Sequence, residues 1–218
     1  MFTYLILIHE FGHVLAGIYF KWNIKEIIIL PFGGLTKFEE LLNKPIIEEF
    51  IITIMGPMFQ ILGYYILKCK VDSSLFTFFN NSILIFNLLP IIPLDGSKIL
   101  ILILQKFISF YKSYQILLFF SCIFFIFLLL LISLIFKSVF LLTTLLLLHK
   151  HIYKVYSEYH LYFRKFLIER YLYKFHFKKH ENINGASLKR IKRDYKHLFY
   201  IGNRYITERE ILRKIFNN

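Results

Sequence analysis

His9-Glu10-Phe11-Gly12-His13 lies inside an apolar run that covers about residues 1–20. On a helix, residues i and i+4 share one face, so His9 and His13 can direct two imidazoles at one metal ion. Glu10 lies alongside, where a carboxylate can activate water. Burying these three polar groups among apolar residues is costly, so the stretch predicts a metal centre in a membrane segment rather than a polar patch that only packs helices.

The composition indicates that a lipid bilayer is the main solvent of this chain. Of its 218 residues, 57% are hydrophobic, which is far above an ordinary soluble domain. The net charge of +13 is concentrated at the C-terminal end, where 17 Lys and Arg face 6 Asp and Glu from Lys150 onward. Because this basic part directly follows an apolar stretch, it fits a cytoplasmic segment under the positive-inside rule, and we expect no nucleic-acid partner.

Apolar stretches of roughly membrane-spanning length recur along the chain. They cover about residues 1–20, 47–67, 74–104 and 115–136, with a shorter one at 138–149. We therefore expect an all-α polytopic membrane protein with about five membrane segments. The expected domains are a membrane domain at 1–150, a basic aromatic linker helix at 151–180 and a small α/β tail at 181–218.

The third stretch is too long for one span and is interrupted by Pro90, Pro93 and Gly96. Broken backbone inside a membrane needs protein or water around it, so a polar site is expected there. A catalytic zinc with two histidines needs a third protein ligand and one open position. Asp95, at the break, is the obvious supplier, although Asp-Gly after Pro is also an ordinary turn.

Two further segments have recognisable local structure. Glu26–Phe38 combines β-branched runs with a Pro-Phe-Gly-Gly turn, which predicts a β-hairpin or a re-entrant loop. In the tail, Leu198–Ile201 predicts a short strand, and Thr207-Glu-Arg-Glu210 a capping box that opens a last helix.

His-Glu-x-x-His in one apolar segment, followed by Asn87-x-x-Pro-x-x-Pro-Leu-Asp-Gly96 in a later one, resembles the site-2 protease family of intramembrane zinc metalloproteases. Leu30-Pro-Phe-Gly-Gly34 and Gly56-Pro57 are similar to its sporulation branch. The resemblance covers about residues 3–110 well.

The resemblance assigns a role to each candidate site residue. His9, His13 and Asp95 would bind one Zn²⁺, and Glu10 would act as general acid and base. Asn87 would contact the substrate carbonyl or oxyanion, although this side chain could equally cap a helix. The last two assigned residues, Gly33 and Gly34, would allow close approach of an extended substrate.

The function implied is that of an intramembrane zinc endopeptidase, which cleaves a membrane-associated protein with zinc-activated water. In the sporulation branch the substrate is a sigma factor precursor, and inhibitory membrane proteins restrain the protease. The location implied is the bacterial cell membrane, specifically the mother-cell membrane around the forespore, with the C-terminal tail cytoplasmic. The sequence leaves the oligomeric state open and is compatible with a homo-oligomer.

Two departures from the branch pattern keep alternatives open. Members carry a membrane helix before the zinc helix, whereas His9 follows only eight residues, so we expect either a lost helix or a start codon assigned too far downstream. Members also carry a CBS-type regulatory domain, of which residues 181–218 resemble a reduced remnant. One alternative is a catalytically silent metal-binding or regulatory membrane protein. A metal-ion carrier is disfavoured, because no chain of polar residues crosses several spans.

Overall fold

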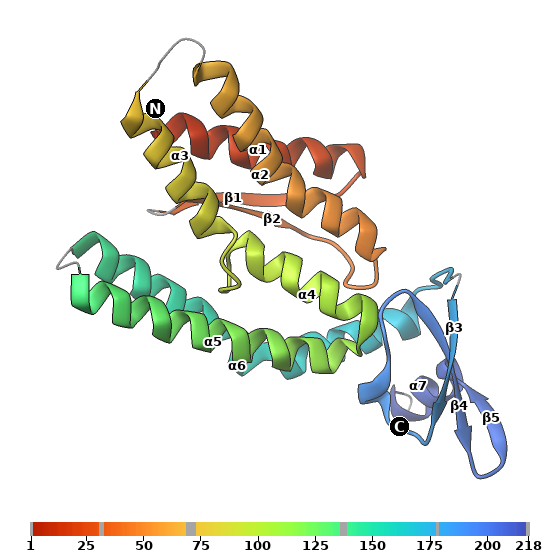
Figure 1. Ribbon diagram of the computed structural model, residues 1–218. Coiled ribbons are helices and arrows are strands. Elements are labelled where there is room, and N and C mark those ends of the chain that lie inside the picture. Colours follow the sequence, from red (N-terminus) through yellow and green to blue (C-terminus); the bar gives the residue numbers. More distant parts are fainter. Residues whose placement is uncertain (1, 31–32, 69–72, 136–138, 178, 217–218) are drawn as a thin grey trace.

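The structure is a computed structural model that describes residues 2–30, 33–68, 73–135, 139–177 and 179–216. It is mostly helical, with a two-stranded and a three-stranded sheet (Figure 1). The elements, in chain order, are α1 (Phe2–Tyr19), β1 (Ile24–Leu30), β2 (Gly33–Phe38), α2 (Ile46–Lys68), α3 (Ser74–Asn87), α4 (Asp95–Phe107), α5 (Phe110–Ile135), α6 (Val139–Leu172), β3 (Lys179–Asn184), a 3₁₀ turn (Leu188–Arg190), β4 (Tyr195–Ile201), β5 (Arg204–Thr207) and α7 (Glu208–Phe216).

The N-terminal half is built around the pairing of α1 with α2. The two helices pack along each other, and the β1–β2 hairpin lies against α1 (Figure 1). The hairpin is antiparallel, with Ile28 opposite Leu35 and Ile29 opposite Gly34, so the expectation of a β-hairpin is confirmed. The Pro31-Phe32 part of its turn lies outside the described residues.

The third apolar stretch is divided into two helices, as its prolines predict. Helix α3 ends at Asn87 and α4 begins at Asp95. Pro90 and Pro93 lie in the connection, where they cannot donate a helical hydrogen bond. This break places Asp95 at the first turn of a helix rather than in the middle of a continuous span.

Two helices of the described residues are long and apolar enough to cross a membrane, judged by length and composition: Ile46–Lys68 and the Phe110–Ile132 part of α5. The mostly helical fold with small sheets agrees with the expected fold class. The sheet-bearing tail is α/β, as expected. The figure of about five membrane segments is not established by the structure and stays a prediction.

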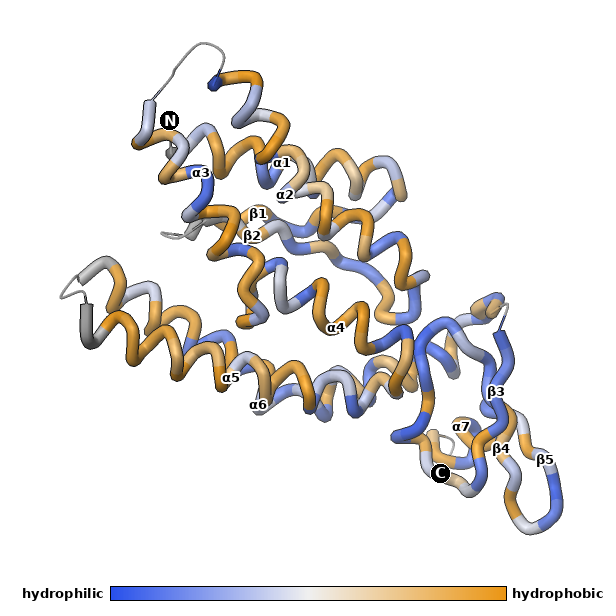
Figure 2. Tube along the Cα trace, viewed as in Figure 1, coloured by the Kyte–Doolittle hydropathy of each residue, from blue (hydrophilic) through white to orange (hydrophobic). Residues whose placement is uncertain are grey.

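The tail shares a core with the helices that precede it. Helix α6 continues without interruption past residue 150 to Leu172, and hydrophilic residues concentrate in and around the tail (Figure 2). Phe110 of α5 and Phe166 of α6 are buried in one apolar cluster with Phe199 of β4 and Leu212 of α7. The predicted cap of the last helix is present, since Glu210 N donates to Thr207 Oγ1 over 3.3 Å. The division into three domains that the sequence predicts remains a prediction.

Candidate metal centre

Two helices far apart in the sequence bring three candidate ligands together. His9 and His13 lie on one face of α1, and Asp95 is the first residue of α4. Asp95 Oδ2 lies 2.9 Å from His9 Nε2 and 3.1 Å from His13 Nε2. The two Nε2 atoms are 3.2 Å apart. All three residues are buried.

Hydrogen bonds to the outer nitrogen of each imidazole fix which nitrogen faces the centre. His13 Nδ1 donates to the backbone carbonyl of Ile52 over 2.8 Å, and His9 Nδ1 donates to Gln60 Oε1 over 3.0 Å. A neutral imidazole carries one proton, so a donating Nδ1 leaves Nε2 with a lone pair. Both histidines therefore present lone pairs toward Asp95.

This donor set fits a zinc ion. Two imidazole nitrogens and a carboxylate oxygen that face one another repel unless a proton or a metal cation lies among them. Ligands of a tetrahedral zinc, each at about 2.0–2.1 Å from the metal, are separated by about 3.3 Å, and the three separations here are close to that value. Two His and one carboxylate also form a known catalytic zinc set with an open position.

Glu10 lies beside the three ligands and is held by the hairpin. One of its carboxylate oxygens lies within 4.8 Å of the ligand nitrogens of His9 and His13. The hydroxyl of Thr36, in β2, donates to Glu10 Oε2 over 2.5 Å, and both side chains are buried. A Cβ at Gly34 would collide with the Glu10 carboxylate, so a larger residue there would displace that side chain. Asp95 is a better candidate for the third ligand than Glu10, because one Asp95 oxygen contacts both imidazoles.

Several residues that support the centre were not among those predicted from the sequence. Thr36 is two positions after Gly34, and the alternation of strand side chains places both on the face toward Glu10. Gln60 is four positions after Gly56, on the same face of α2. Lys98 Nζ contacts the other Asp95 oxygen, Oδ1, over 3.2 Å, at the i, i+3 spacing of a helix. Each of these spacings is visible in the sequence, but none is informative before the partner helix is known.

Two other predicted residues, Asn87 and Gly33, have no recorded contact with this centre among the described residues. Asn87 is buried at the end of α3, and in the described part of the chain its side chain makes no hydrogen bond. Gly33 pairs with Leu30 at the turn end of the hairpin. The substrate-binding roles of Asn87, Gly33 and Gly34 therefore stay predictions.

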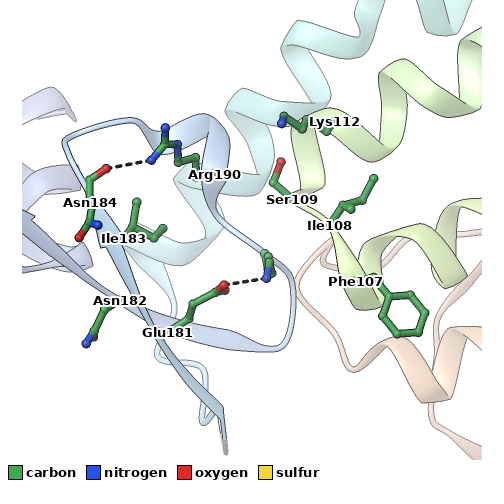
Figure 3. A pocket seen from close by; sticks show the side chains of 10 residues that line it. Phe107, Ile108, Ser109, Lys112, Glu181, Asn182, Ile183, Asn184 and Arg190 are labelled. Atoms are coloured by element: carbon green, nitrogen blue, oxygen red, sulfur yellow. Dashed lines mark hydrogen bonds and ion pairs between the residues drawn. The ribbon is translucent and has the colours of Figure 1, made fainter.

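A separate pocket of about 510 Å³ lies between β3 and the turn that joins α4 to α5 (Figure 3). Within it Lys192 pairs with Glu181 over 2.7 Å, and Arg190 donates to the Asn184 carbonyl over 3.0 Å. None of the residues that line it belongs to the metal centre. The pocket is therefore a feature of the tail junction.

Comparison with known proteins relates part of this chain to a known family. The model of peptidase family M50 matches residues 1–72, which include His9, Glu10 and His13. Stage IV sporulation protein FB of Bacillus subtilis is 42% identical over 119 residues, which is 51% of this chain and 41% of that protein. Over residues 1–72 the chain resembles the site-2 protease family, peptidase family M50. This family is membrane-embedded, and its members are zinc metalloproteases.

Two further similarities, both to proteins of one organism, are weaker. A zinc metalloprotease of Methanocaldococcus jannaschii is 28% identical over 122 residues, 51% of this chain and 35% of that protein. The solved site-2 protease from the same organism superposes with a TM-score of 0.56 and 22% identity, over 70% of this chain and 74% of that chain, which is a likeness of fold. The matched part of the chain spans less than half the length of the sporulation protein and of the archaeal metalloprotease.

Proposed function

We propose that this chain is an intramembrane zinc endopeptidase with His9, His13 and Asp95 as metal ligands and Glu10 as general acid and base. The observation that carries the proposal is the convergence of three lone-pair atoms from α1 and α4, with a carboxylate beside them. Such a buried polar set among apolar helices is costly unless it binds a cation and performs chemistry.

Each side chain of the centre has a separate role in the proposed hydrolysis. When bound, zinc polarises the scissile carbonyl and makes water a better nucleophile at neutral pH. Glu10 takes a proton from the attacking water and passes it to the leaving amine. The hydroxyl of Thr36 positions the Glu10 carboxylate. The hydrogen bonds from Nδ1 hold both imidazoles with Nε2 toward the centre. Asn87 would donate its amide to the oxyanion.

The β1–β2 hairpin supports the proposed substrate class. A helical substrate hides its carbonyls, so a membrane segment must unwind before hydrolysis. An extended peptide can then add to a strand edge of the hairpin through main-chain hydrogen bonds. Gly33 and Gly34 would leave room for it beside Glu10. By similarity to the sporulation protein, the substrate we propose is a membrane-associated sigma factor precursor, with inhibitory membrane proteins as further partners.

The proposed topology follows the apolar stretches and the charge. About five membrane segments within residues 1–150 would be followed by the basic linker 151–180 and a cytoplasmic tail at 181–218. The two long apolar helices support a membrane location. The compartment we propose is the bacterial cell membrane, specifically the mother-cell membrane around the forespore.

Glu10→Gln tests the proposal directly. The chain is coexpressed with a matching precursor, and cleavage is compared among wild type, Glu10→Gln and the matched control Glu158→Gln, whose side chain lies on α6 away from the centre. Cleavage by wild type and the control alone is expected. Equal cleavage by Glu10→Gln overturns the mechanism. A wild type that retains zinc but cleaves nothing would favour the silent metal-binding protein instead.

A further inference from the structure

The outer nitrogen of His9 contacts a buried amide network that joins three helices. Gln60, in the middle of α2, is fully buried, and its Oε1 accepts the proton of His9 Nδ1. Its Nε2 donates to Asn80 of α3 twice, to the backbone carbonyl over 3.0 Å and to Oδ1 over 3.2 Å. A chain of contacts thus runs from α3 through α2 to a candidate zinc ligand on α1.

This network fixes the direction of the Gln60 amide. Its nitrogen faces two acceptors of Asn80, so its oxygen must face His9. An oxygen there accepts only from a protonated Nδ1, which in turn leaves Nε2 free to bind a metal. The orientation of one amide therefore sets the tautomer of the ligand.

The same contacts argue against simple packing. A buried polar group in an apolar helix bundle costs free energy unless it is fully hydrogen-bonded. An aliphatic side chain of similar volume would fill this position at lower cost. Hydrogen bonding to His9 explains an amide at this position better than packing does.

We propose that Gln60 and Asn80 are positioning residues of the zinc centre, through which α3 tunes the metal affinity of His9. The inference rests on the proposed zinc site, but it concerns metal binding and does not depend on proteolysis. Loss of such outer hydrogen bonds in other metalloproteins weakens metal binding about 10- to 100-fold.

Substitutions at Gln60 separate positioning from packing, because the two roles predict opposite orders. Gln60→Met keeps the volume and removes the acceptor, so positioning predicts weaker zinc binding by about 10- to 100-fold. Gln60→Glu keeps an oxygen for His9 Nδ1 and loses the amide donor to Asn80, so zinc affinity should fall less than in Gln60→Met. If Gln60 only fills space, Met is tolerated and the buried charge of Glu is the harmful change.

Substitutions at Asn80 give a second test, which is independent of whether the chain folds with Met at position 60. Asn80→Leu leaves Gln60 Nε2 with only the backbone carbonyl, and zinc binding is expected to weaken several-fold. Asn80→Asp keeps the Oδ1 acceptor and should bind zinc like wild type. The control is Ser113→Ala, which removes a buried hydroxyl that donates to the Phe110 carbonyl within α5, a helix that carries none of the candidate ligands.

The measurement is competition for zinc between the detergent-solubilised full chain and a chromophoric chelator, with thermal unfolding of the zinc-free forms as a check of folding. Zinc binding is expected to be weaker in Gln60→Met and Asn80→Leu than in Gln60→Glu and Asn80→Asp, and Ser113→Ala is expected to bind zinc like wild type. Wild-type affinity in both apolar variants overturns this inference and leaves the protease proposal intact. Failure of wild type itself to bind zinc overturns both.

Discussion

The bond from Thr36 to Glu10 gives the sharpest prediction for catalysis. Thr36→Val replaces the hydroxyl with a methyl group and leaves Glu10 Oε2 without the donor now 2.5 Å away. A hydrogen bond to a charged group contributes about 1.5–3 kcal/mol, and each 1.36 kcal/mol changes a rate about tenfold. Because Thr36 contacts the base, we expect kcat to fall about 10- to 100-fold with KM changed less than about threefold.

The assay is cleavage of a precursor fusion by the purified chain in proteoliposomes, with zinc content measured in parallel. Thr36→Ser keeps the donor and should retain most of the wild-type kcat. The matched control is Thr53→Val, since the buried Thr53 hydroxyl bonds only to the Glu49 carbonyl within α2. A kcat for Thr36→Val equal to that of the Thr53 control, or a Thr36→Ser variant as slow as Thr36→Val, would refute a positioning role.

Three further changes probe the hairpin and the tail. Gly34→Ala places a Cβ against Glu10 and should abolish cleavage while zinc stays bound, and an active variant would show that β2 lies elsewhere. Arg193→Met should lower the free energy of unfolding by about 2 kcal/mol, because it removes charged hydrogen bonds between the tail and the helices, and chemical denaturation in detergent measures this. Burial raises the pKa of Glu169, so its contribution to stability is present below its ordinary pKa and is lost as pH rises through the raised value. In Glu169→Gln the melting temperature should therefore fall less steeply with rising pH over that range. A dependence of the melting temperature on pH equal to that of wild type would contradict this.

Sequence signals that act over a few residues predicted much of the architecture. The i, i+4 spacing of His9 and His13 defined one face of α1, and the β-branched runs around a glycine turn defined the hairpin. Pro90 and Pro93 marked the break before α4, because proline cannot continue a helical ladder. The length of α6 could not be predicted in this way, because aromatic and basic residues continue its helical pattern with no stop signal until after Leu172.

The candidate site was predictable to the extent that its members resemble a known motif. The ligands and Glu10 belong to such patterns, whereas Thr36 and Gln60 acquire their roles only through packing between distant segments. Gln60 is 51 residues from His9, and Thr36 is 26 residues from Glu10. A polar residue in an apolar run signals a buried network, but its partner depends on how the helices pack.

Helix α2 connects the metal centre to the tail. Ile52, Gly56 and Gln60 are spaced by four, so they form one row on the face toward α1. Ile52 and Gln60 accept the Nδ1 protons of the two histidines, and a Cβ at Gly56 would collide with the His13 imidazole. The orientation of both imidazoles therefore depends on how closely α2 lies against α1.

The tail holds α2 at the end nearest this row. Arg193 bonds to Glu49, which lies one turn before Ile52, and to Gln105 on α4, the helix that begins with Asp95. Asp194 accepts the backbone N–H of Ile46 at the start of α2. One tail segment thus fixes both the helix that orients the histidines and the helix that carries the third ligand. None of the candidate ligands comes from the tail. Because the tail fixes the position of both helices, Arg193→Met should still weaken zinc binding. The effect should be larger than that of a change at an exposed tail residue such as Arg209.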